Sequence, residues 1–159
     1  MIIVSDSSPL ISFAILGILD ILKKTTEKIV VPTAVYEEIS IPQEPYSKEI
    51  AMFLKDKVIP VENRVAVKLL EKEVDPGEAE AIVLALEKSI ADILIDDPKG
   101  RRTASSHGLY PIGTIGVLIQ AKKNGYISQI KPLLDRLIRN RIRIGDSLYQ
   151  KALKLARET

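Results

Sequence analysis

Short apolar runs rich in β-branched residues alternate along the chain with longer segments of helical character. Buried strands are expected at residues 1–5 (MIIVS), 28–31 (KIVV), 91–95 (ADILI) and 110–112 (YPI). Helices are expected at residues 9–24, 32–39, 48–55, 78–88, 99–107, 114–123, 129–139 and 147–157. Strands separated by helices favour right-handed crossovers. The pattern predicts a single α/β domain over residues 1–159, with three α/β/α layers and a central, mostly parallel sheet.

Local signals indicate where several of these helices begin and end. Ser8 followed by Pro9 is typical of an N-cap and a first helical residue. The triplet Asp75-Pro76-Gly77 is a turn signal directly before a strongly helical run. Gly125 stands where a C′ glycine is expected, and Asp146 is expected to cap the last helix. These positions set the predicted boundaries.

Composition limits the chemistry that the chain can perform. Hydrophobic residues make up 46% and charged residues 28% of 159, which is typical of a packed globular domain. There is no cysteine, and His107 is the one histidine. Disulfide scaffolds, thiolate zinc sites, cysteine nucleophiles and histidine clusters are therefore excluded. Any chemistry must come from carboxylates, hydroxyls, lysine or arginine.

The first apolar residues do not predict a membrane segment. The longest apolar stretch, residues 9–22, is interrupted by Asp20 and is too short to cross a bilayer. No basic segment precedes the first apolar run, as a signal peptide would require. We therefore expect a cytoplasmic protein that does not bind a membrane.

Charge is divided unevenly along the sequence. Residues 1–96 contain ten Lys and Arg against seventeen Asp and Glu, a net charge of −7. Residues 97–159 contain thirteen against four, a net charge of +9. An acidic half could hold cations while a basic half meets phosphates, although both sets could also be solvated helix faces. The sequence leaves these two interpretations open.

Acidic residues follow several of the predicted strands or begin the helices after them. The positions concerned are Asp6, Glu37, Glu38, Glu78, Glu80, Asp96 and Asp97. Each one alone has a structural explanation, as a turn former or a partner of a helix dipole. Together they are expected at the carboxyl edge of a parallel sheet, where functional crevices lie. Clustered carboxylates repel one another unless a cation compensates, and Mg²⁺ or Mn²⁺ prefers oxygen ligands. The set therefore predicts a Mg²⁺ or Mn²⁺ site.

Helical spacing distinguishes the two glutamates that begin the helix after Gly77. Glu78 shares one face with Ala81 and Ile82, on the side that packs against the sheet. Glu80 shares a face with Leu84 and is turned away by roughly 200°. This geometry favours Glu78 as the residue that faces the site.

Four segments together resemble a known family. They are IIVSDSSPLI, VVPTAVYEEI, DPGEAEAIVLA and LIDDPKGRRTASSHGLYPIGTIGVLIQAKKNGYI, in this order over nearly the whole chain. They resemble PIN-domain proteins, and most closely the branch of VapC-type toxins. The resemblance implies a Mg²⁺- or Mn²⁺-dependent ribonuclease that cuts single-stranded RNA. It also implies an antitoxin protein as partner and a homodimer.

The resemblance assigns catalytic and metal-binding roles to acidic residues by position. Asp6 matches the family's first-strand aspartate and Glu38 its second acidic position. Glu78 matches the third, with Glu80 as the competing choice. Asp96 and Asp97 together match the acidic end of the third strand, and the resemblance does not decide which of the two is the ligand.

Five further residues are candidates for binding the substrate. Ser8 and Thr114 would orient waters or the scissile phosphate. Lys99, Arg101 and Arg102 would clamp the RNA backbone, or else form an exposed helix start. Thr114 is also a departure, because many PIN nucleases have a further aspartate at this point.

Two other functions remain as alternatives. The first is a catalytically weak or inactive PIN-like protein that binds RNA or an antitoxin, which Thr114 motivates. The second is a phospho-acceptor receiver domain, which also uses aspartates at strand ends. A receiver needs an acidic pair after the first strand and a lysine at a later strand end, whereas this chain supplies only Asp6 and no convincing lysine.

Overall fold

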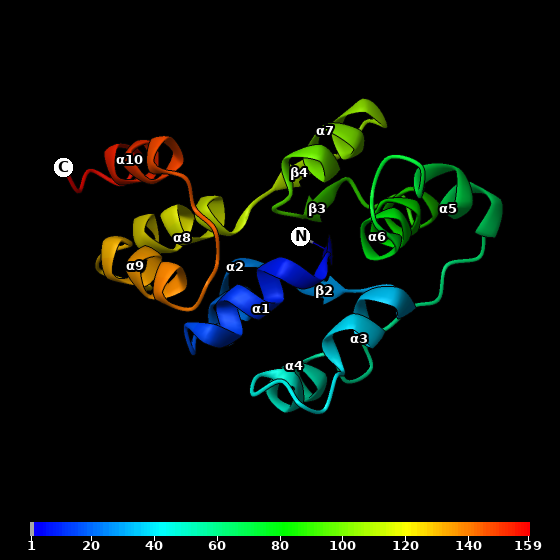
Figure 1. Ribbon diagram of the computed structural model, residues 1–159, viewed down its shortest axis with the longest axis horizontal. Helices are drawn as coiled ribbons and strands as arrows, with labels where there is room; N and C mark the ends of the chain where they lie inside the picture. Colours follow the sequence, from blue (N-terminus) through cyan, green and yellow to red (C-terminus); the bar gives the residue numbers. More distant parts are fainter. Residues whose placement is uncertain (1) are drawn as a thin grey trace.

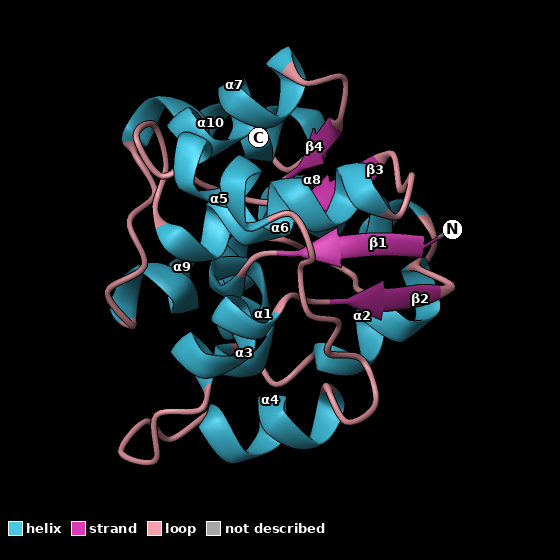
Figure 2. Cartoon of the chain, turned by 90° about the vertical axis from the view of Figure 1, so that its right-hand side faces the viewer, coloured by secondary structure: helices cyan, strands magenta, loops and turns pink. Residues whose placement is uncertain are grey.

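The centre of the molecule is a four-stranded sheet in a computed structural model that describes residues 2–159. The strands are β1 (Ile2–Ser5), β2 (Lys28–Val30), β3 (Asp92–Leu94) and β4 (Tyr110–Ile112). All pairs are parallel, in the order β2-β1-β3-β4, and β1 and β2 run side by side in the same direction in Figure 2. The carboxyl ends of the strands therefore meet at one edge. Met1, which the first predicted strand included, lies outside the described residues.

Helices cover both faces of the sheet (Figure 1). They are α1 (Ser7–Ile15), α2 (Leu19–Thr25), α3 (Thr33–Ile39), α4 (Ser47–Phe53), α5 (Arg64–Leu70), α6 (Pro76–Glu87), α7 (Pro98–Ser106), α8 (Thr114–Lys123), α9 (Lys131–Arg139) and α10 (Asp146–Leu155). The three-layer α/β/α architecture with a parallel sheet is thus confirmed.

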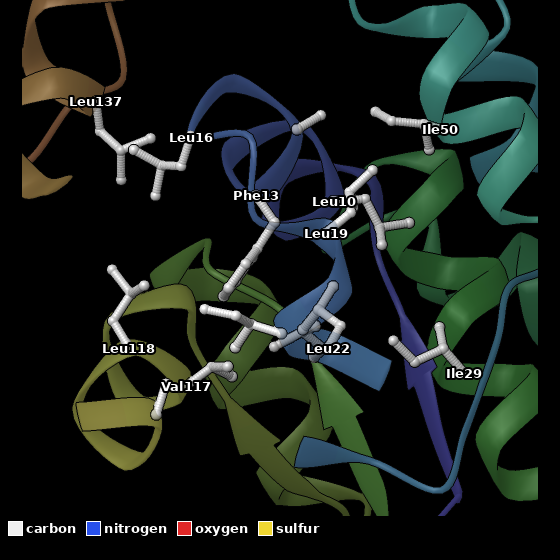
Figure 3. Close-up of a cluster of buried hydrophobic side chains, with 14 of the residues drawn as sticks. Leu10, Phe13, Leu16, Leu19, Leu22, Ile29, Ile50, Val117, Leu118 and Leu137 are labelled. Atoms are coloured by element: carbon white, nitrogen blue, oxygen red, sulfur yellow. The ribbon is translucent and has the colours of Figure 1, made fainter. Parts of the chain in front are cut away.

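Alternating strand residues divide the core into two parts. Ile3, Ile29 and Leu94 face the larger part, with buried residues of α1, α2, α3, α4, α8, α9 and α10. Figure 3 shows Phe13 there, among side chains of α1, α2 and α8. Val4 and Ile93 face the smaller part, which α5, α6 and α7 cover. Strand residues buried on both faces explain the continuous apolar runs in the sequence.

Several predicted boundaries were wrong. The helix expected over residues 9–24 is divided at Gly17, whose φ of +70° ends α1 in the left-handed conformation that glycine favours. The N-cap of α1 is Asp6 rather than Ser8. The last helix begins at Asp146, with Gly145 as its N-cap. Helix α5 was not predicted, although Asn63 caps it by accepting a hydrogen bond from the Ala66 amide at 3.0 Å.

The basic residues of the second charge segment, residues 97–159, lie in two parts of the fold. Helices α8, α9 and α10 lie at one end of the long axis in Figure 1, and α5 and α6 lie at the other. The basic residues of α8, α9 and α10 therefore lie away from α6, whereas Lys99, Arg101 and Arg102 lie on α7, beside the acidic residues. Among the described residues, no helix is long and apolar enough to span a membrane.

Candidate functional site

Asp6 stands at the carboxyl edge of the sheet, where β1 ends. Its amide donates a hydrogen bond to the Leu94 carbonyl at 2.8 Å, which continues the pairing of β1 with β3. Its side chain makes no cap hydrogen bond to α1 and is only 4% exposed. The buried Oδ1 has no hydrogen-bond partner within residues 2–159. A buried acceptor without a partner is costly, so this oxygen is available for a ligand.

Glu78 is held in place by the capping box that begins α6. The Glu78 amide donates to Asp75 Oδ1 at 2.8 Å, and the Asp75 amide donates back to Glu78 Oε1 at 3.2 Å. The second oxygen, Oε2, is buried and has no partner within the described chain. Glu78 is 5% exposed. The local sequence Asp-Pro-Gly-Glu thus fixes one carboxylate oxygen and leaves the other available.

Glu38 reaches the same place from α3. Its Oε2 accepts a hydrogen bond from the Ser7 hydroxyl at 2.8 Å. The Glu38 carboxylate lies against the backbone of Gly77, so closely that a Cβ at Gly77 would collide with it. A side chain at this position would therefore displace the Glu38 carboxylate.

The pKa values show that these carboxylates influence one another. Burial raises the pKa of Asp6 to about 8; the Ser7 amide lowers it, and the charges of Glu78, Asp75 and Glu38 raise it further. Burial likewise raises the pKa of Glu78 to about 7, the Asp75 amide opposes this, and the charges of Asp75 and Asp97 add to it. Burial also raises the pKa of Glu38, against the Ser7 hydroxyl. The site therefore resists carrying its full negative charge without a cation.

The two aspartates after β3 turn to different helices. Asp97 is the N-cap of α7, and its Oδ2 accepts from the Gly100 amide at 3.0 Å. Asp96 accepts from both the amide and the hydroxyl of Thr114, the first residue of α8, at 2.7 and 2.6 Å. The charge of Asp97 raises the pKa of Glu78, which places Asp97 within the electrostatic reach of the cluster. Both carboxylate oxygens of Asp96 therefore accept a hydrogen bond from Thr114.

The predicted substrate-binding residues differ in position. Arg101 donates a hydrogen bond from Nη1 to the Ile95 carbonyl at 3.1 Å, at the end of β3. A Cβ on Gly113 would lie 3.0 Å from this Nη1 and 3.2 Å from Asp96 Oδ1. The side chains of Arg101 and Asp96 therefore both lie next to Gly113. Lys99, Arg102 and Ser8 are exposed, and it is Ser7 that contacts Glu38. The hydroxyl of Thr114 donates to Asp96.

Glu80 points away from this cluster, as its helical position predicted. It is 6% exposed, and its Oε1 accepts from the Ala34 amide at 3.0 Å. Its Oε2 accepts from Arg64 Nη1 at 2.9 Å. Glu80 therefore ties the start of α3 to α6.

Two members of the site were missed by sequence reasoning. Asp75 was interpreted only as part of a turn, and Ser7 was overlooked in favour of Ser8. The signal for Asp75 was present, because an aspartate three residues before a glutamate at a helix start is typical of a capping box. No comparable signal distinguishes Ser7 from Ser8.

The donor set fits a hard divalent cation. Within residues 2–159 no three acidic or histidine side chains are arranged to hold a metal ion as they stand. Asp6 and Glu78 nevertheless each bury an oxygen without a partner in the described chain, and burial and neighbouring carboxylates raise the pKa of both groups. Oxygen ligands of this kind suit Mg²⁺ or Mn²⁺.

A parallel sheet between two helical layers, with buried acids at its carboxyl edge, defines an α/β protein. The family model DUF3368, described as a PIN domain, matches residues 2–158. The chain therefore belongs to the PIN-domain family, which confirms the resemblance to PIN-domain proteins at the level of the family and replaces the receiver alternative. PIN domains are generally nucleases that use divalent metal ions. Comparison with curated proteins and with solved structures finds no significant match.

Proposed function

We propose that this protein is a metal-dependent endoribonuclease that cleaves phosphodiesters of single-stranded RNA. The observation that carries the proposal is the pair of buried carboxylate oxygens without partners, Asp6 Oδ1 and Glu78 Oε2. Family membership supports a nuclease, and the basic residues of the last third of the chain support a nucleic-acid substrate.

Four acidic residues would hold Mg²⁺ or Mn²⁺. Asp6 and Glu78 supply the oxygens without partners, and Glu38 and Asp97 stand within their electrostatic reach. When bound, such an ion lowers the pKa of a water and stabilises the charge of a phosphoryl transition state. Asp96 is the fifth predicted ligand. In this proposal it does not bind the ion but holds the start of α8 next to the end of β3, because it accepts two hydrogen bonds from Thr114.

The chain's own residues orient the site. The capping box holds Glu78, and the Ser7 hydroxyl holds Glu38. Both carboxylates are therefore already in position before substrate binds. Arg101 stands at the end of β3 beside Gly113, where its guanidinium can bind a backbone phosphate. Exposed Lys99, Arg102 and Ser8 would extend this contact, and the Thr114 hydroxyl would orient a water or the phosphate if it left Asp96.

Cleavage of a labelled single-stranded RNA with and without Mg²⁺ or Mn²⁺ tests the proposal. We expect cleavage to need the ion and to fall by at least about a hundredfold in Asp6→Asn, as is common when a metal ligand or its support is removed. Asp20→Asn is the matched control, because Asp20 is an exposed aspartate on α2. Equal cleavage by wild type and Asp6→Asn would disprove the assignment.

The toxin role rests on the resemblance to the VapC-type branch. We propose a cytoplasmic toxin that pairs with an antitoxin protein and forms a homodimer. Expression of wild type and Asp6→Asn in a bacterial host tests the toxin role, since only the wild type should arrest growth. Sedimentation velocity tests the dimer, and a monomer at micromolar concentration would contradict it.

A specific observation favours a second candidate, a PIN protein that binds RNA or an antitoxin without cutting. Thr114 occupies the position where many relatives place a further acid, and it uses both its amide and its hydroxyl on Asp96. Calorimetry with Mn²⁺ separates the two candidates. Tight RNA binding without any Mn²⁺ binding would favour the second.

A further inference from the structure

A cavity of about 450 Å³ lies at the far end of α8 from the acidic site. Its lining includes Lys122, Ser128, Gln129, Lys131, Arg139 and Arg157. Lys122 stands eight residues after Thr114 on α8, which places the two about 12 Å apart along the helix axis. Helix α8 thus connects the acidic edge of the sheet, at Thr114, to this basic cavity.

The acidic residues of the cavity are already neutralised by partners. Glu158 accepts hydrogen bonds from the amides of Ile130 and Lys131, at 2.7 and 3.0 Å, and pairs with Lys122 Nζ at 3.0 Å. Asp135 pairs with Lys131 Nζ at 3.1 Å and accepts from the Tyr149 hydroxyl at 2.6 Å. Asp135 and Glu158 carry two negative charges against the four positive charges of Lys122, Lys131, Arg139 and Arg157, so the lining has a net charge of +2.

Arg139 and Arg157 bring the number of positive charges in the lining above the number of carboxylates. Within residues 2–159 neither forms an ion pair, and both are exposed. Arg139 is on the face of α9 that also carries Lys131 and Asp135, at four-residue spacing, so its position on the cavity follows from helical geometry. Arginine guanidinium groups bind phosphate oxygens in a bidentate manner, and Ser128 and Gln129 add neutral donors.

We propose that this cavity is a second phosphate subsite, which binds the RNA backbone about 12 Å along α8 from Thr114. The inference rests on the proposed function in taking RNA as the ligand. Polar and charged side chains dominate the lining, and no aromatic residue is among them, so the cavity offers neither an apolar anchor for a peptide nor a stacking surface for a base. The subsite therefore binds the backbone without reading sequence.

Fluorescence anisotropy with a fluorescein-labelled oligouridylate, in EDTA, tests the subsite independently of cleavage. In Arg139→Gln/Arg157→Gln we expect RNA affinity to fall at least about fivefold. The slope of log K against log salt should become shallower by about 0.7 for each phosphate that the variant no longer neutralises. Arg136→Gln/Arg143→Gln is the matched control, because both of these arginines are exposed and outside the cavity lining. Its affinity should stay within about twofold.

Other outcomes would overturn the proposal. Equal weakening in both double variants would mean diffuse charge attraction, and no weakening in either would mean that the cavity is not used. If the cavity variant no longer binds oligoglutamate but retains RNA, the cavity is a site for an acidic protein. Should the variant not fold, amide NMR of the wild type with the same RNA decides, since the Ser128 and Gln129 signals must shift. RNA binding through the cavity without any metal-dependent cleavage would refute the nuclease and leave the subsite standing.

Discussion

The carboxylate of Glu78 lies directly against the backbone of Gly100. A Cβ built on Gly100 would be 2.5 Å from Glu78 Oε2 and 2.7 Å from the Ile95 side chain. The oxygen concerned is one of the two buried carboxylate oxygens that have no partner within residues 2–159. The start of α7 therefore determines where this ligand oxygen lies.

Gly100→Ala is expected to displace Glu78 and to weaken Mn²⁺ binding. Alanine favours a helix over glycine by about 1 kcal/mol, but the collision should outweigh this and lower the free energy of unfolding. Gly116→Ala is the matched control, because Gly116 is the third residue of α8, as Gly100 is of α7, and its Cβ would meet only Ile112 at 3.8 Å. Urea unfolding and Mn²⁺ calorimetry check both variants. Unchanged Mn²⁺ affinity in Gly100→Ala would contradict the role given to Glu78.

The metal-free protein is expected to lose stability as the pH rises toward 8. Burial raises the pKa of Asp6 from 3.8 to about 8, so the folded state binds the proton more tightly than the unfolded state. This contribution is fully present below pH 3.8 and is lost as the pH rises through about 8. In Asp6→Asn the total loss in the free energy of unfolding over this pH range should be smaller than in the wild type. We expect a difference of more than about 1.4 kcal/mol, the value of one pKa unit. Part of the loss of stability should remain in this variant, because Glu78, whose pKa is about 7, also loses its proton in this range.

Urea unfolding in EDTA at several pH values measures this effect, with Asp20→Asn as control. Saturating Mn²⁺ should remove most of the decline in the wild type, because an ion that binds only the folded state stabilises it. Parallel pH profiles of wild type and Asp6→Asn would show that Asp6 does not titrate in this range.

Glu80→Ala is expected to loosen the start of α3 and so to disturb Glu38. The substitution removes the acceptor of the Ala34 amide, and loss of a buried hydrogen-bonding partner costs about 1–3 kcal/mol. The ion pair with Arg64 adds little, because the Arg64 side chain is 59% exposed. Hydrogen exchange at Ala34 should accelerate. Glu37→Ala, at an exposed position of the same helix, should leave that exchange unchanged. Similar exchange in both variants would contradict the positioning role.

Glu158→Ala is expected to release the end of the chain from α9. Burial raises the pKa of Glu158, but hydrogen bonds from Ile130, Lys131 and Lys122 outweigh this, so the pKa is lowered from 4.5. The stability that this carboxylate contributes is therefore present above pH 4.5 and is lost as the pH falls through the lowered pKa. At pH 7 we expect a loss of about 1–3 kcal/mol. Thermal unfolding measures it, and Glu158→Gln, which keeps one acceptor oxygen, should lose less. An equal loss at pH 7 and pH 3 would exclude the charged carboxylate as its cause.

Much of the fold could be predicted because strong local signals mark its elements. Strand β4 and helix α8 begin and end where the sequence predicts, since Pro111 and Gly125 restrict the chain near their ends. The division at Gly17 was missed, because the apolar pattern continues through it. Helix α5 was missed because only Val67 and Leu70 among its residues are buried, which leaves a weak pattern.

The sequence by itself determined the four strands, most of the helices between them, the acids at strand ends and the orientation of Glu78 against Glu80. These features depend on periodicity and on neighbouring residues, and both are visible along the chain. Only the tertiary structure decided that Asp96 turns to Thr114, that Asp75 and Ser7 belong to the site, and that Arg139 and Arg157 share a cavity. These relationships join residues that parallel strands and packed helices bring together across long stretches of sequence, and no local pattern encodes the direction in which each side chain turns.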